Sequence, residues 1–159
     1  MAGEAMDQEW AGLAGQAPEQ REARMIEQCK AVAALDDDAR VQALAAMVRA
    51  EYALPATDLH AFTLSRLRAW IAIEHEDREM ALRLARGYDT VFQTMPGEMA
   101  MRRSSVVQGV ARNDLSGDEV TTLFALIPSI IQQVPRMQQD TLSARAAPKR
   151  QSKPWWRFW

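Results

Sequence analysis

The side chains that most often carry out chemistry in proteins are few in this chain and far apart along it. There are two histidines, His60 and His75, and one cysteine, Cys29. On a single helix the histidines would stand about four turns apart, so they could not bind the same metal ion from that helix. A di-iron helical bundle needs a Glu-x-x-His motif on each of two helices. The chain contains no such motif.

A polar cluster around His75 is the remaining candidate for a metal site. His75 and Glu79 have the i, i+4 spacing of neighbours on a helix, and Glu76 or Asp77 could add an oxygen ligand. Motifs this short match often by chance. We therefore interpret the segment as a solvated group of charges that neutralise one another, and we expect neither a metal ion nor a cofactor.

The sequence also lacks the motifs of nucleophilic catalysis and of nucleotide binding. It has no Gly-x-Ser-x-Gly, no Ser-x-x-Lys and no phosphate-binding glycine loop, and its seven glycines are scattered. Cys29 falls on the apolar side of an expected helix, where cysteine behaves as a small hydrophobic residue, so we expect a half-buried core thiol. We predict that the protein is not an enzyme.

Two further groups allow more than one interpretation. Arg102 and Arg103 precede two serines, so they could mark a kinase site or the start of a DNA-contacting helix. We prefer a polar helix face whose arginine stems lie over the bundle. The methionines Met95, Met99 and Met101 are more typical of adaptable core or of an interaction surface than of metal ligands.

Apolar residues recur at helical spacing between capping and helix-breaking residues, which predicts an all-α protein. With 159 residues, the chain is long enough for one ordinary domain. We expect a single five- or six-helix bundle over residues 19–135. The helices expected are Glu19 to Leu35; Asp36, Asp37 or Asp38 to just before Pro55; Thr57 or Asp58 to the polar cluster that starts at Glu74; Asp77 to Met95; Glu98 to Arg112; and Ser116 to Val134, kinked at Pro128.

One helix boundary allows an alternative. The third and fourth helices could be one continuous helix from Asp58 to Met95, but we favour a break because helices of that length are rare in compact domains.

Residues 1–18 are rich in Gly, Ala, Gln and acidic side chains, with Trp10 isolated among them. We expect that segment to be flexible, with at most one frayed turn.

The most unusual segment is the C-terminal tail, residues 136–159. It carries six basic side chains and one acidic one, a net charge of +5, whereas residues 1–135 carry 13 basic and 20 acidic side chains, a net charge of −7. Four aromatic and two basic side chains fall within its last seven residues. The residues predicted to bind a membrane or a partner are Lys149, Arg150, Lys153, Trp155, Trp156, Arg157, Phe158 and Trp159.

This composition supports four interpretations of the tail. Tryptophan settles at the level of lipid headgroups, and basic side chains are attracted to anionic lipid, so the tail could anchor the protein to a membrane surface. It could equally insert aromatic anchors into a groove of a partner protein. It could fold back on its own acidic bundle, or stack its tryptophans on the bases of single-stranded nucleic acid, the interpretation we favour least.

We therefore predict a non-catalytic helical adaptor or accessory subunit, tethered through its tail to a membrane surface or to a larger protein assembly. The alternative is a helical nucleic-acid-binding regulator that uses Arg102, Arg103 and the tail. The single cysteine, the lack of an apolar leader and the lack of a long apolar run predict a cytoplasmic protein that does not span a membrane. Apolar helix faces could also form a homo-oligomer interface.

Overall fold

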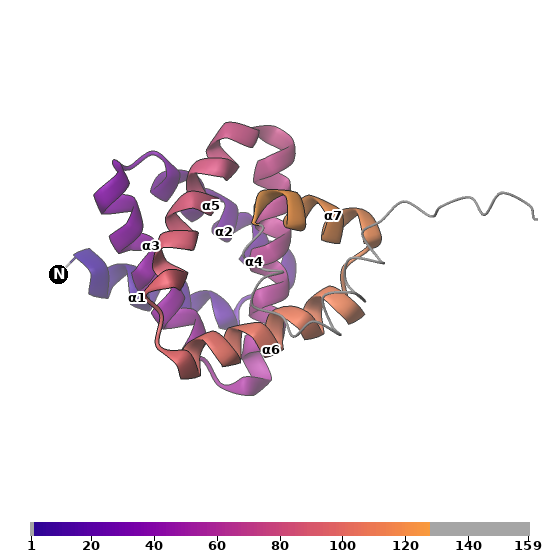
Figure 1. Ribbon diagram of the computed structural model, residues 1–159. Coiled ribbons are helices and arrows are strands. Elements are labelled where there is room, and N and C mark those ends of the chain that lie inside the picture. Colours follow the sequence, from indigo (N-terminus) through magenta and orange to yellow (C-terminus); the bar gives the residue numbers. More distant parts are fainter. Residues whose placement is uncertain (1, 128–159) are drawn as a thin grey trace, which may run out of the picture.

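The computed structural model describes residues 2–127, and in this part of the chain every regular element is helical, as predicted. The elements form a helical bundle in which α4 runs through the middle, with α1 and α3 on one side and α7 on the other (Figure 1). They are α1 (Ala2–Gly12), the short 3₁₀ helix η1 (Leu13–Gly15), α2 (Pro18–Ala33), α3 (Asp37–Tyr52), α4 (Ala56–Glu76), α5 (Arg78–Gln93), α6 (Gly97–Asn113) and α7 (Gly117–Leu126).

Two helices begin at the capping residues that the sequence predicts. The Asp36 carboxylate accepts a hydrogen bond from the backbone N–H of Ala39 at 2.9 Å, at the start of α3. At the start of α7, Ser116 and Glu119 form a capping box in which each side chain accepts from the other residue's backbone N–H. These contacts satisfy amide groups that the first helical turn leaves without partners.

The break between α4 and α5 is confirmed, and Asp77 makes it. Its backbone is extended, at φ −148° and ψ 93°, and its carboxylate accepts from the backbone N–H of Met80 at 3.0 Å. The same residue therefore ends one helix and caps the next. The predicted cap of α4 is wrong: neither Thr57 nor Asp58 caps it, because the helix already begins at Ala56, after Pro55, without a side-chain cap.

The N-terminal segment differs from the flexible stretch that we expected over residues 1–18. Residues 2–12 form α1, which packs along α3, and the Trp10 side chain is completely buried. Its ring meets the edge of Phe62 in α4, with the ring centroids 5.6 Å apart. The tertiary contact stabilises a helix whose own sequence shows only a weak apolar stripe, so residues 2–127 contain seven α-helices rather than five or six.

Two groups of apolar side chains hold the helices together. The larger group extends from Trp10 in α1 to Ile127, and the smaller joins α4, α6 and α7 around Leu67, Val110 and Leu123. Full burial of a Val, Leu, Ile, Phe or Met side chain stabilises a fold by roughly 1.5–3 kcal/mol. Within residues 2–127, no helix is both long enough and apolar enough to cross a membrane.

Candidate functional site

The eight tail residues that we predict to bind a membrane or a partner lie outside the described residues. They are Lys149, Arg150, Lys153, Trp155, Trp156, Arg157, Phe158 and Trp159. The predicted kink at Pro128 and the end of the last predicted helix lie outside them as well. What the structure does show is the body that would carry the tail: its buried polar groups, its histidines and its surface clefts.

An ion pair that the sequence analysis missed lies in the centre of the body. Glu51 of α3 and Arg66 of α4 are both buried, with Oε2 and Nε 2.7 Å apart. The buried Thr63 hydroxyl donates to the other carboxylate oxygen at 2.9 Å. Arg66 also donates to the Tyr52 hydroxyl, at 3.5 Å. A signal was present in the sequence, because Arg66 stands four residues from both Phe62 and Trp70 and so falls within the apolar stripe of α4.

Aromatic rings and a second arginine surround this ion pair. The guanidinium carbon of Arg66 lies 5.8 Å from the centre of the Tyr88 ring, and Tyr88 meets Trp70 edge to face at 4.5 Å. The guanidinium carbon of Arg103, in α6, lies 3.5 Å from the centre of the Phe92 ring. Cations are attracted to aromatic faces, and most strongly where water is excluded. The rings therefore help to accommodate two buried positive charges.

Burial and charge set the protonation states of this cluster. Burial lowers the pKa of Arg103 to about 10. Burial would also lower the pKa of Arg66, but the negative charge of Glu51 outweighs it and holds that pKa above its usual value. The pKa values of Tyr52 and Tyr88 are raised, chiefly by burial. At neutral pH the cluster thus holds an ion pair and uncharged phenols, an arrangement that suits packing rather than proton transfer.

Cys29 is more deeply buried than the half-buried thiol that we expected. No part of its side chain is exposed, and burial raises its pKa to about 12. The thiolate, not the thiol, is the nucleophile. At neutral pH Cys29 is therefore an unreactive core residue in this conformation.

Arg102 and Arg103 have different surroundings, which corrects the single polar face that we predicted. Arg103 is only 3% exposed, because its side chain turns inward over Phe92. Arg102 is exposed and donates to the backbone carbonyl of Leu54. A nucleic-acid surface that uses both arginines is therefore not available in this conformation.

Each histidine faces a different carboxylate. His60 Nε2 lies 2.8 Å from Asp114 Oδ2 and so joins α4 to the loop after α6. His75 lies 3.8 Å from Glu74, which also pairs with Arg78. Nearby, Lys30 of α2 pairs with Glu76 at 2.6 Å. Among residues 2–127, no group of three or more His, Cys, Asp or Glu side chains is arranged to hold a metal ion.

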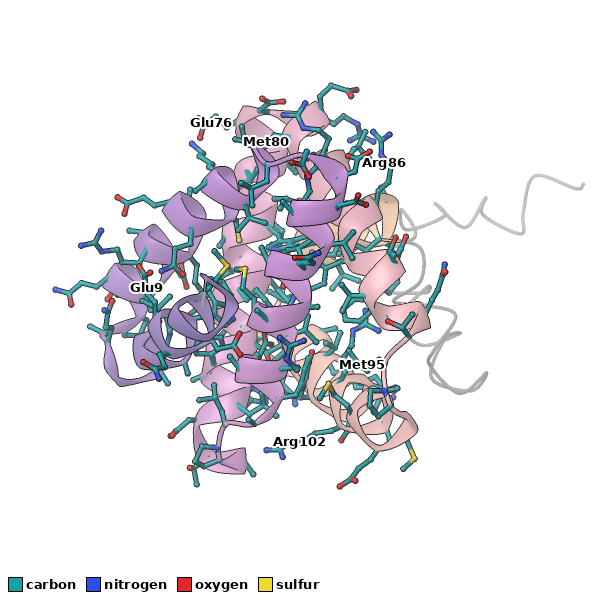
Figure 2. All side chains as sticks on the ribbon, turned by 90° about the vertical axis from the view of Figure 1, so that its left-hand side faces the viewer. Glu9, Glu76, Met80, Arg86, Met95 and Arg102 are labelled. Carbon is teal, nitrogen blue, oxygen red and sulfur yellow. The ribbon has the colours of Figure 1, made fainter. Side chains whose placement is uncertain are left out.

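The outer face of α3 is flanked by two largely apolar clefts, and we call this surface the α3 face. The cleft beside α1 has a volume of about 460 Å³, and the cleft beside the α5–α6 turn has about 160 Å³. Arg49 lines both, with a side chain that is 59% exposed. Met95 and Met99 line the smaller cleft, in keeping with an interaction surface. Met95 lies toward the same end of the molecule as Arg102 (Figure 2).

No family model, no curated protein and no solved structure matches this chain. We therefore infer the function of the chain from its own residues.

Proposed function

We propose that the protein is a non-catalytic helical adaptor or accessory subunit, attached through residues 136–159 to a membrane surface or to a larger protein assembly. The observation that carries the proposal is the composition of the tail, with a net charge of +5 and four aromatic side chains in its last seven residues. Residues 1–135 have a net charge of −7. A basic aromatic segment on an acidic body suits attachment through the tail rather than through a broad face of the bundle.

The body supports this proposal in two ways. Its ion pair between Glu51 and Arg66 and its cysteine, Cys29, are enclosed in the core and do not meet solvent. On the outside, the α3 face offers apolar clefts with the exposed Arg49 between them. Clefts of this kind can receive apolar side chains of another protein chain, including a second copy of this one.

The tail has enough binding free energy for reversible attachment to anionic lipid. Four basic residues near the surface contribute about 1 kcal/mol each, which alone gives only millimolar affinity. If each of the four terminal aromatic side chains recovers about 1 kcal/mol of its burial free energy, the affinity reaches the micromolar range. A cytoplasmic location, which the single cysteine favours, would expose the tail to the anionic leaflet.

Co-sedimentation with lipid vesicles tests the membrane form of the proposal. The full chain should sediment with anionic vesicles and not with neutral ones, with a blue shift of tryptophan fluorescence. A truncation after Ala147 should lose the binding, as should a full-length variant with Trp155, Trp156, Phe158 and Trp159 changed to Ala. A matched control has the tail residues in scrambled order, and lipid binding should tolerate that change.

The assembly form makes a different prediction for the same control. A protein groove recognises a defined order of anchors, so pull-down by the native tail should be lost with the scrambled tail. If the tail binds neither vesicles nor any protein in an order-dependent way, the proposed function is wrong.

A further inference from the structure

A third cleft, of about 370 Å³, lies between the first turns of α3 and one face of α5. Unlike the clefts of the α3 face, it is lined mainly by charged residues: three arginines and two carboxylates. Its lining residues are Asp37, Arg40, Val41, Glu79, Arg83, Arg86, Gly87 and Thr90. Arg86, at its outer edge, is labelled in Figure 2.

Gly87 brings the two helices close enough to form this cleft. A Cβ atom at that position would lie 2.6 Å from Leu44 Cδ1, which is too close for two carbon atoms that are not bonded to each other. The aliphatic part of Arg40 lies across the same glycine, with Cδ 3.7 Å and Cγ 3.8 Å from that Cβ position. The close approach of α3 and α5 therefore fixes Arg40 on one side of the cleft.

Arg40 is a buried donor that its surroundings satisfy only in part. It is 8% exposed, with Nη1 donating to Asp37 at 2.8 Å and Nη2 to the Leu35 carbonyl at 2.5 Å. Its Nε is buried and has no hydrogen-bond partner. Because that nitrogen is enclosed, Arg40 contributes its positive charge to the wall of the cleft rather than a free hydrogen-bond donor.

The two other arginines, Arg83 and Arg86, have guanidinium nitrogens that form no hydrogen bond within residues 2–127. Arg83 is half-buried and forms no hydrogen bond or ion pair within residues 2–127, although Glu79 stands one turn earlier at a spacing that favours a pair. Arg86 donates from Nε to the Leu82 carbonyl at 3.3 Å, which leaves its terminal nitrogens without a partner in the same range. The Asp37 carboxylate is already engaged by Arg40.

We propose that this cleft binds a phosphate group, with Arg83 and Arg86 as the donors and the buried Arg40 as a third positive charge beside them. Planar guanidinium groups match the geometry of phosphate oxygens, which is why arginine is enriched at such sites. The volume exceeds that of a phosphate ion and falls at the small end of ligand sites. The remainder of a small phosphorylated molecule, or a lipid headgroup, therefore also fits.

Backbone amide NMR of the full chain tests the site. Inorganic phosphate, added at constant ionic strength, should give saturable shifts confined to residues 37–41 and 83–90. Arg83→Gln and Arg86→Gln should each weaken binding at least fivefold while leaving the remaining spectrum unchanged. The matched control is Arg24→Gln, which removes an exposed arginine paired with Glu27 on α2 and should leave the affinity unaltered.

Two further probes distinguish the sources of the phosphate. Glycerol 3-phosphate tests a soluble ligand, and vesicles containing phosphatidic acid test a lipid headgroup. Because the tail could bind vesicles as well, only vesicle binding that falls in Arg83→Gln counts toward the cleft. Shifts that do not saturate, that spread over the surface, or that persist in the double variant of Arg83 and Arg86 would overturn the proposal.

Discussion

The buried pair of Glu51 and Arg66 gives the sharpest prediction for the stability of the fold. Replacing Glu51 with Leu would leave Arg66 charged, 2% exposed and without its counter-ion, close to the second buried cation, Arg103. The Thr63 hydroxyl would also lose its acceptor. Removing one partner of a buried ion pair costs about 3–5 kcal/mol, a large share of the stability of an ordinary domain.

Urea denaturation followed by circular dichroism at 222 nm measures this loss. With an m value of about 2 kcal/mol per molar, the transition midpoint of Glu51→Leu should fall by about 2 M. The double variant Glu51→Leu/Arg66→Met replaces both charges with apolar side chains of similar size. It should recover most of the loss, because apolar replacement of a whole buried pair is often neutral or stabilising.

A double-mutant cycle decides whether the two residues act as a pair. We expect a coupling free energy of several kcal/mol between Glu51 and Arg66. A loss below about 1 kcal/mol in Glu51→Leu, or a double variant that is as unstable as the two single changes added together, would show that the two residues do not act as a buried ion pair. The matched surface control is Glu76→Leu, whose exposed pair with Lys30 should contribute less than about 1 kcal/mol.

Three other changes test separate parts of the structure. Trp10→Ala should destabilise the protein by about 3–5 kcal/mol in urea denaturation, because Trp10 is fully buried against Phe62; a negligible effect would show that α1 is not packed. Gly87→Ala should lower the melting temperature because its Cβ meets Leu44. Gly109→Ala, whose Cβ would lie 3.6 Å from the His60 ring, should instead raise stability by up to about 1 kcal/mol. The reverse order of stabilities would contradict the packing described. Burial raises the pKa of Cys29 in the folded state, so the stability that Cys29 contributes below pH 9.0 is lost as the pH rises toward about 12. In that window the difference in unfolding free energy between the native protein and Cys29→Ala should shrink by about 1.4 kcal/mol per pH unit. A constant difference would contradict a buried thiol.

Local signals explain what could be predicted from the sequence. Asp36, Asp77 and Ser116 cap the first turns of their own helices, so their role depends on neighbours in the chain, and those helix starts are confirmed. The apolar periodicity likewise predicts an all-α fold.

Features that depend on contacts between distant segments could not be predicted in this way. Trp10 is isolated in its own segment, and its burial depends on α3 and α4. The buried ion pair of Arg66 could not be predicted because its partner, Glu51, lies on another helix. The cleft lined by Arg83 and Arg86 could not be predicted for a related reason, because the residues of α5 form it only together with Arg40 of α3.

The proposed function depends on attachment of the helical bundle to its target through the basic aromatic tail. The most direct measurement is vesicle co-sedimentation of the full chain beside the full-length variant with Trp155, Trp156, Phe158 and Trp159 changed to Ala. We expect micromolar binding of the native chain to anionic vesicles and loss of that binding in the variant. If vesicles are not the target, we expect order-dependent capture of a partner protein by the tail. Equal behaviour of the native chain and the variant in both assays would contradict it.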